Sequence, residues 1–314
     1  MKNIFLLLFL TVGFNAFSQE KKITEAEIAI NPLIKGTLFS PENPTNKTKV
    51  VIMIAGSGPT NRSGNQIGMQ TNCSRYLAQS LAKNDIAAFS YDKRIFAQMI
   101  AGTLDEKKLS FEDFINDAKD VIAYFKNQKQ YAKIIVLGHS EGSLIGMVAA
   151  NNNNADGFIS IAGPARPIDE VLTEQLMKMM PSHTEEIKHD LELLKKGETF
   201  ELKSSNPTIV SVFRESVQPY MISWLKYNPQ DEIRKLKIPV LLINGTKDLQ
   251  VPSSDAELLK KAKPEAKLEI ITNMNHVLKE VKGDDAENKA TYNNPDLPIM
   301  NELTIIVNQF IKSI

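Results

Sequence analysis

The chain has few of the residues that bring disulfide, metal or nucleic-acid chemistry. Among its 314 residues there is one cysteine, Cys73, so no disulfide can form within the chain. Lysine and arginine together number 37, as do aspartate and glutamate, which leaves no basic excess and predicts no nucleic-acid partner. No cluster of cysteine, histidine and carboxylate residues has the spacing of a metal site, and we expect neither a metal nor a cofactor. The 42% of hydrophobic residues is typical of a globular protein with one sizeable core.

Long hydrophobic runs are also missing, and the short run near the start predicts export. The opening stretch MKNIFLLLFLTVGFNAFSQE combines a lysine, an apolar run over residues 4–12, and small residues at Ala16 and Ser18. This is the three-part pattern of a secretory signal peptide, and it predicts cleavage before Gln19. A membrane anchor is the alternative, but a membrane span needs about 20 apolar residues. We therefore expect a signal peptide over residues 1–18, a periplasmic or secreted mature protein, and no stable membrane insertion after cleavage.

Short apolar runs alternate with helical patterns along most of the chain. Edge strands are predicted in ITEAEIAI and IKGTLFSP, and buried strands in KVVIMI, IAAFSYD, KIIVLG, GFISIAG, IPVLLING and KLEIIT. This alternation is typical of an α/β fold, with a mainly parallel central sheet and helices on both faces. About residues 164–237 break the rhythm with helical spacing only. We expect one domain over residues 19–314, with a helical cap inserted between two of its strands.

The sequence GHSEG follows the predicted strand KIIVL and precedes a helix of small and apolar residues. An ordinary tight turn is one interpretation. The other is a nucleophile elbow, in which Ser140 projects from a sharp turn and the flanking Gly138 and Gly142 avoid clashes. The strand before the motif and the helix after it favour the elbow.

A serine nucleophile needs a histidine base, which an acid orients. His276 lies just after the apolar run KLEII, whereas the three other histidines lie in the elbow or on charged helical patterns, namely His139, His183 and His189. Asp248 follows the strand IPVLLIN and is the predicted acid; Asp255, within the next helical pattern, is the alternative. The chain order Ser140, Asp248, His276 matches that of hydrolases built around such an elbow.

An oxyanion hole needs two N–H donors beside the nucleophile. The backbone N–H of Glu141 is one predicted donor, because this residue follows the nucleophile. The N–H of Ser57, in the glycine-rich loop AGSGPTNRSGN, is the other. A phosphate-binding loop is the alternative interpretation, but the stretch lacks the Gly-Lys-Ser/Thr ending. Arg62, in the same loop, is a candidate substrate contact.

Several stretches resemble the α/β-hydrolase superfamily, and more narrowly bacterial serine carboxylesterases with a helical cap. They are AGSGPTNRSGN, YDKR, GHSEG, SVQPYMISWLKYNP and PVLLINGTKDLQVP. The resemblance implies a Ser140–Asp248–His276 triad and a small-molecule acyl ester as the substrate. Ala55 and Ile95 depart from the histidine and glycine common in these relatives.

Four functions remain open at this point. The first is an exported serine esterase that works through an acyl-enzyme intermediate, with Met180 and Trp224 of the cap as candidate substrate contacts. The second is a serine aminopeptidase or amidase, in which the Glu141 carboxylate or cap acids hold a substrate amine; these acids are Glu185, Glu186, Asp190 and Glu192. The third is a binding module with a degenerate site, and the fourth a thioesterase or perhydrolase on the same scaffold. The oligomeric state is not predicted.

Overall fold

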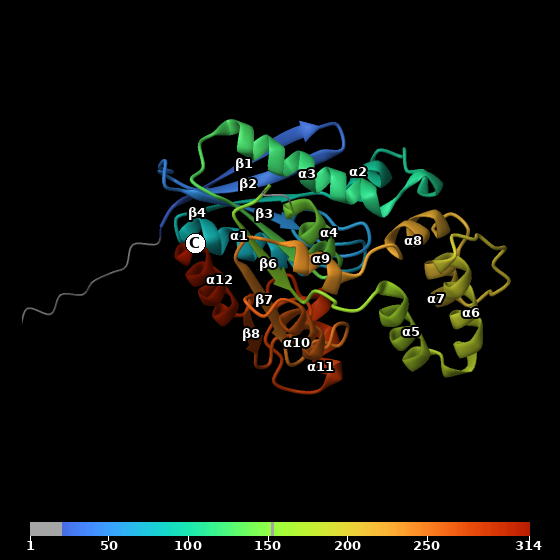
Figure 1. The fold of residues 1–314 in the computed structure, drawn as a ribbon. Helices are drawn as coiled ribbons and strands as arrows, with labels where there is room; N and C mark the ends of the chain where they lie inside the picture. Colours follow the sequence, from blue (N-terminus) through green and yellow to red (C-terminus); the bar gives the residue numbers. More distant parts are fainter. Residues whose placement is uncertain (1–20, 152–153) are drawn as a thin grey trace, which may run out of the picture.

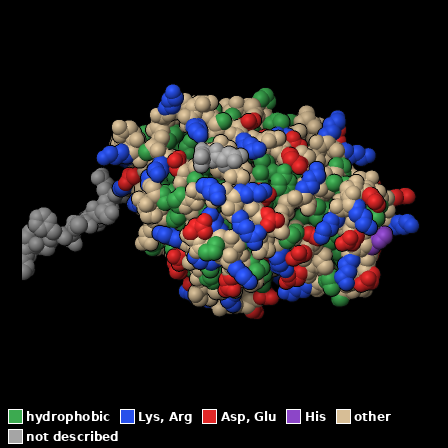
Figure 2. All heavy atoms as spheres, in the orientation of Figure 1, with side chains coloured by type: hydrophobic (Ala, Val, Ile, Leu, Met, Phe, Trp, Pro, Cys, Tyr) green, Lys and Arg blue, Asp and Glu red, His purple; other side chains and the backbone are tan. Residues whose placement is uncertain are grey.

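The computed structural model describes residues 21–151 and 154–314 (Figure 1). The predicted signal peptide and its cleavage site lie outside these residues. Among the helices of the described part, none is both long and apolar enough to cross a membrane. Acidic and basic side chains are interspersed on the face shown in Figure 2.

One eight-stranded sheet organises the chain, in the order β1-β2-β4-β3-β5-β6-β7-β8. β1 and β2 form an antiparallel pair, β2 is antiparallel to β4, and the strands from β4 to β8 in this order are parallel to their neighbours. The strands are β1 (Ile23–Asn31), β2 (Ile34–Pro41), β3 (Lys49–Ile54), β4 (Ile86–Tyr91), β5 (Ile134–His139), β6 (Gly157–Ile161), β7 (Val240–Gly245) and β8 (Lys267–Ile271). The predicted mainly parallel α/β fold is confirmed.

Two strand predictions need correction. β8 was expected to be buried, but it is the last strand of the sheet and alternates exposed with more buried residues. β2 was expected at an edge, but it lies between β1 and β4. In both cases the strand itself is where the apolar pattern predicted it, and only its position in the sheet differs.

Helices cover both faces of the sheet. Alternate residues of the central strands point to opposite faces, so Val50 and Ile52 join one hydrophobic cluster and Val51 and Met53 the other. The first cluster contains residues of α3 (Phe111–Gln128), α4 (Glu141–Ala150), α9 (Pro229–Lys235) and α10 (Ser253–Ala262). The second contains residues of α1 (Cys73–Lys83) and α12 (Asn301–Ser313). The shorter helices α2 (Arg94–Ile100) and α11 (Asp285–Ala290) and the 3-10 turns η1 (Glu106–Lys108), η2 (Pro181–His183) and η3 (Thr291–Asn293) lie in the connections.

The helical insertion follows β6 and precedes β7. It contains α5 (Ile168–Met179), α6 (Thr184–Lys195), α7 (Pro207–Phe213) and α8 (Gln218–Trp224), which stand to one side of the sheet in Figure 1 and which we call the cap. α9 instead contacts α4 and α10 of the main body. α8 contacts α3 and η1, and it thereby joins the cap to the body.

Candidate active site

Ser140 occupies a strained turn between β5 and α4. Its backbone has φ 54° and ψ −125°, a conformation that residues other than glycine rarely adopt. A Cβ atom at Gly138 would lie 2.2 Å from the carbonyl oxygen of Gly142, and one at Gly142 would lie 2.3 Å from that of Ile54. The backbone N–H of Ser140 donates to the carbonyl of Ile161, at 2.9 Å. The two glycines permit a turn that no larger residue would fit, as the elbow interpretation requires.

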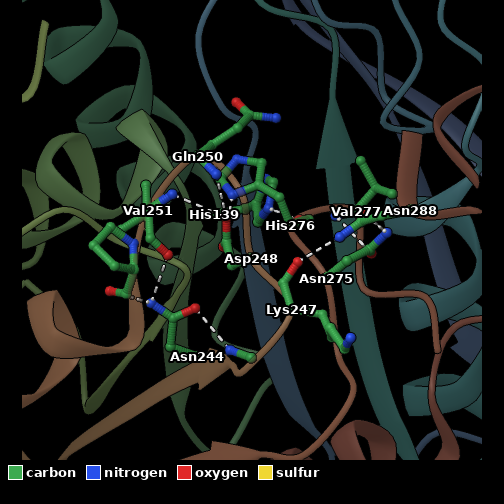
Figure 3. Close-up of polar contacts among 12 residues, drawn as sticks. His139, Asn244, Lys247, Asp248, Gln250, Val251, Asn275, His276, Val277 and Asn288 are labelled. Carbon is green, nitrogen blue, oxygen red and sulfur yellow. Dashed lines mark hydrogen bonds and ion pairs between the residues drawn. The ribbon is translucent and has the colours of Figure 1, made fainter. Parts of the chain in front are cut away.

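Asp248 and His276 lie side by side beyond the ends of β7 and β8. His276 Nδ1 and Asp248 Oδ2 are 2.8 Å apart, and the two side chains are 6% and 1% exposed (Figure 3). Asp248 Oδ1 accepts two further hydrogen bonds, from the backbone N–H groups of Gln250 at 2.8 Å and Val251 at 2.9 Å. With Nδ1–H donated to the carboxylate, the Nε2 atom of His276 carries the free lone pair that a general base needs.

The alternative acid, Asp255, does not contact His276 but binds the segment that follows β6. Its carboxylate accepts from the backbone N–H of Ala165 at 2.7 Å and pairs with Arg166 at 3.0 Å. Asp248 is therefore the carboxylate that the structure brings to His276.

His139 links the elbow to the loop that carries His276. His139 Nε2 donates to the backbone carbonyl of His276 at 2.8 Å, and the two ring centroids are 4.9 Å apart. Desolvation, followed by the neighbouring His276, lowers the pKa of His139 to about 4, so its ring is neutral near pH 7. Within the described residues, no hydrogen bond joins Ser140 Oγ directly to His276. His139, adjacent in sequence to Ser140, provides the contact between the two segments.

The two predicted oxyanion donors lie next to the elbow. Ser57, Ser140 and Glu141 line one cavity of about 260 Å³. A Cβ atom at Gly56 would be 3.1 Å from the Ser140 Cβ, so the glycine-rich loop lies directly against Ser140. The Ser57 carbonyl accepts from Gln66 Nε2 at 2.7 Å, which turns it toward the loop. Glu141 is the first residue of α4, where backbone N–H groups lack an acceptor within the helix.

A buried polar cluster that the sequence analysis did not predict lies beneath these donors. Lys93 Nζ contacts Glu141 Oε1 at 2.6 Å, and the Tyr220 hydroxyl donates to Glu141 Oε2 at 3.0 Å. The Lys93 and Glu141 side chains are 4% and 2% exposed. Burial, followed by the Glu141 charge, raises the pKa of Tyr220 well above its usual value, which keeps this hydroxyl a donor. The stretches YDKR, GHSEG and SVQPYMISWLKYNP contain Lys93, Glu141 and Tyr220, respectively, but none of them predicted the contacts among these residues.

A second cavity of about 380 Å³ adjoins the first. Both cavities are lined by residues of the glycine-rich loop, the elbow and α8, including Ser57, Glu141, Tyr220 and Trp224. The second extends between Ile95, Met99, Leu104, Leu109 and Phe114 of the main body and the cap. Trp224, a predicted substrate contact, lines both cavities.

Two other expected substrate contacts line neither of these cavities. Arg62 forms an ion pair with Asp92 at 2.7 Å and another with Glu27 at 3.0 Å, and it lines neither cavity. Met180 packs against the hydrophobic core and also lines neither cavity. The reason is geometric, since a loop position or a helical spacing does not say which way a side chain points.

Comparisons with known proteins agree with this fold. Residues 67–280 match the Hydrolase_4 family model, described as "Serine aminopeptidase, S33". Esterase EstD of Thermotoga maritima is 29% identical over 262 residues, which cover 81% of this chain. This chain spans 60% of the length of that relative.

Solved structures give the same fold. Est1E from Butyrivibrio proteoclasticus superposes with a TM-score of 0.58 at 17% identity, over 92% of this chain and 99% of that one. The Pyrococcus furiosus esterase Pf2001 superposes with a TM-score of 0.55 at 15% identity, over 93% of this chain and 91% of that one. The resemblance to α/β-hydrolases and bacterial esterases is confirmed. The chain belongs to the α/β-hydrolase superfamily, within the Hydrolase_4 family described as serine aminopeptidase, S33.

Proposed function

We propose that the protein is a serine esterase that hydrolyses carboxylic esters with apolar groups. The observation that carries the proposal is the 2.8 Å contact between His276 and Asp248, beside a strained serine elbow. The strained backbone and the buried acid–base pair both cost free energy, and such costs concentrate at functional sites. The names of the esterase relatives support the same assignment.

The mechanism follows from these groups. Ser140 Oγ attacks the ester carbonyl carbon while His276 Nε2 takes its proton, and the carbonyl oxygen becomes an oxyanion that accepts from the N–H groups of Ser57 and Glu141. Collapse of this intermediate breaks the bond to the alcohol, which leaves with the proton that His276 returns. Water then attacks the acyl-Ser140 ester by the same steps and releases the carboxylic acid. Asp248 holds the imidazole and stabilises its positive charge throughout.

The residues around Ser140 favour ester substrates over the peptides with a free α-amine that the family description, serine aminopeptidase, implies. An aminopeptidase must hold a free α-amine, usually with a carboxylate. The acidic residues in the two cavity linings are Glu106 and Glu141. Glu106 pairs with Arg214 Nε at 2.9 Å, and both Glu141 oxygens accept bonds from within the chain. The four cap acids considered above line neither cavity.

We infer which cavity receives each half of the ester. The cavity that contains Ser140 is also lined by Gln250 and Val251, whose N–H groups hold Asp248, so it opens on the side of His276. His276 protonates the leaving alcohol, and the alcohol therefore belongs on this side. The acyl group then occupies the second, larger cavity between the main body and α8.

The decisive test is a substrate panel. The purified protein should hydrolyse nitrophenyl esters, and Ser140→Ala should lower kcat by about a million-fold while the fold persists. Amino-acid nitroanilides should react far more slowly. A higher kcat/KM on the nitroanilides would identify an aminopeptidase instead, and an active Ser140→Ala variant would remove this serine from the mechanism.

A matched pair of variants tests the assignment of the cavities. Leu104 lines only the larger cavity and Leu172 only the cavity that contains Ser140. Leu104→Trp should lower the ratio of kcat/KM for long-chain over acetyl esters of one alcohol. Leu172→Trp should instead discriminate between large and small alcohols of one acid. The opposite pattern would reverse the assignment.

A further inference from the structure

One buried cation contacts both halves of the oxyanion hole. Lys93, between β4 and α2, donates from Nζ to the Gly56 carbonyl at 2.9 Å and to Glu141 Oε1 at 2.6 Å. The ammonium also lies 4.6 Å from the centroid of the Phe114 ring. A carboxylate, a carbonyl and a ring face thus replace the water that this charge would otherwise bind.

The contact with Gly56 controls the direction of the first oxyanion donor. The Gly56 carbonyl and the Ser57 N–H belong to one peptide unit, and the described residues contain no cis peptide bond. In a trans peptide the carbonyl and the N–H point in opposite directions. When Lys93 holds the carbonyl, the Ser57 N–H must point away from Lys93, and this peptide lies against Ser140.

A second contact reaches the same loop from Lys93. Its backbone N–H donates to the Thr60 carbonyl at 3.1 Å, and the Thr60 hydroxyl donates to the Ser57 carbonyl at 3.3 Å. Both peptide units that flank the Ser57 Cα are therefore held through the segment that carries Lys93. The loop cannot rotate its N–H without breaking these bonds.

The contact with Glu141 acts on the second donor. The Glu141 side chain is held by Lys93 from the main body and by Tyr220 from α8 of the cap. Its backbone N–H begins α4 immediately after the nucleophile. One ammonium therefore fixes the distance between the glycine-rich loop and the first turn of α4.

We propose that Lys93 is a positioning residue that aims the N–H groups of Ser57 and Glu141 at the oxyanion. This inference rests on the proposed esterase function, because the oxyanion forms only during attack by Ser140. Lys93 lines the larger cavity. Its Nζ contacts Gly56, Glu141 and the Phe114 ring, so it acts on the oxyanion through these neighbours. Its effect is greatest on the transition state, in which the carbonyl oxygen carries the charge.

The test compares Glu141→Gln with the double variant Lys93→Met/Glu141→Gln. In the single variant the glutamine carbonyl still accepts from Lys93, and the Gly56 carbonyl remains held. The single variant keeps the anchor but leaves the Lys93 ammonium without its counter-charge, whereas the double variant loses the anchor and leaves no charge inside. A lower kcat in the double variant therefore cannot be ascribed to an unpaired buried charge. Melting temperatures within a few degrees of each other confirm that both variants are folded.

Three measurements are made on each variant. Removal of one oxyanion donor lowers kcat by about 100- to 1000-fold. An N–H group that is present but no longer points at the oxyanion should therefore lower kcat by about 10- to 100-fold. We expect kcat of the double variant to fall by that factor relative to the single variant, with KM within about threefold. The affinity for a trifluoromethyl ketone, which forms a tetrahedral adduct with the serine, should fall by the same factor. The affinity for the matching methyl ketone should not change.

The outcomes separate the possible failures. Equal kcat and equal trifluoromethyl ketone affinity in the two variants would overturn the inference. A parallel loss of affinity for both ketones would also overturn it, because that pattern indicates general damage to the cavity. Absence of ester hydrolysis in the wild type would reject the proposed function, while the ketone comparison still reports on Lys93. If the double variant does not fold, Lys93→Arg is measured with the same ketones, since it keeps the charge for Glu141 but changes the geometry at Gly56.

Discussion

Replacement of Asp248 by asparagine tests the triad by changing one atom. The carboxylate accepts three bonds, two at Oδ1 from Gln250 and Val251 and one at Oδ2 from His276. An asparagine side chain has one acceptor oxygen and one donor NH₂ group. It therefore cannot satisfy all three donors in either orientation of its amide.

The magnitude follows from the two orientations. If the oxygen keeps the backbone bonds, the NH₂ group faces His276 Nδ1 and forces the proton to Nε2, where the base must be free. If the oxygen faces His276, the NH₂ group meets the N–H groups of the exposed Gln250 and the buried Val251, and the buried donor loses its acceptor at about 1–3 kcal/mol. The working orientation is thus disfavoured by about 1–3 kcal/mol, which lowers kcat by about 5-fold to 150-fold at 1.36 kcal/mol per decade.

The assay is kcat on a nitrophenyl acetate at pH 7.5, with Asp255→Asn as the matched control. Asp255 is buried as deeply but contacts Ala165 and Arg166, so its variant should lose stability and keep kcat within about threefold. The reasoning is refuted if Asp248→Asn retains more than a third of the wild-type kcat, or if Asp255→Asn loses as much as Asp248→Asn.

Three further predictions concern stability and processing. The pKa of His139 falls from 6.5 to about 4 on folding, so the unfolded chain binds a proton that the folded chain does not; the free energy of unfolding should drop by up to about 3 kcal/mol as the pH falls from 6.5 to 4. Urea titrations of His139→Gln should lack this loss, whereas the exposed His189→Gln should keep it. Gly142→Ala should lower both the melting temperature and kcat, because its Cβ would meet the Ile54 carbonyl at 2.3 Å; wild-type values for both would contradict the elbow packing. We also propose that the protein is exported and begins at Gln19, which intact mass of protein from the native host will test; a retained Met1 would oppose it.

The fold class was readable from the sequence because both faces of the central strands are covered. β3, β5 and β7 are continuous apolar runs, since every residue of a covered strand contacts one helical layer or the other. The capping box of Ser110 and Asp113 at the start of α3 is likewise local, since it consists of hydrogen bonds between residues three apart. The burial of β8 could not be predicted, because an edge position is a property of the strand order and not of the run itself.

In the candidate site, too, local features could be predicted from the sequence and side-chain directions could not. The placement of Ser140, Asp248 and His276 at one edge of the sheet was predictable because each follows a strand, and parallel strands bring their carboxyl ends to one edge. Their roles as a triad remain a prediction. Arg62 instead pairs with Asp92 and Met180 packs against the core, because the patterns that suggested them do not fix the direction of a side chain.

The sequence by itself determined the strands, the elbow and the residues at the strand ends, since these depend on local periodicity and on neighbours within a few positions. Only the tertiary structure decided that Lys93 and Tyr220 share the carboxylate of Glu141, 48 and 79 residues away from it along the chain. No local pattern encodes such a contact, because it depends on how the connection after β4, the elbow and the cap fold over one another. The physical reason for the cluster is likewise tertiary: a charge becomes costly enough to need these partners only when the packed cap and body exclude water from it.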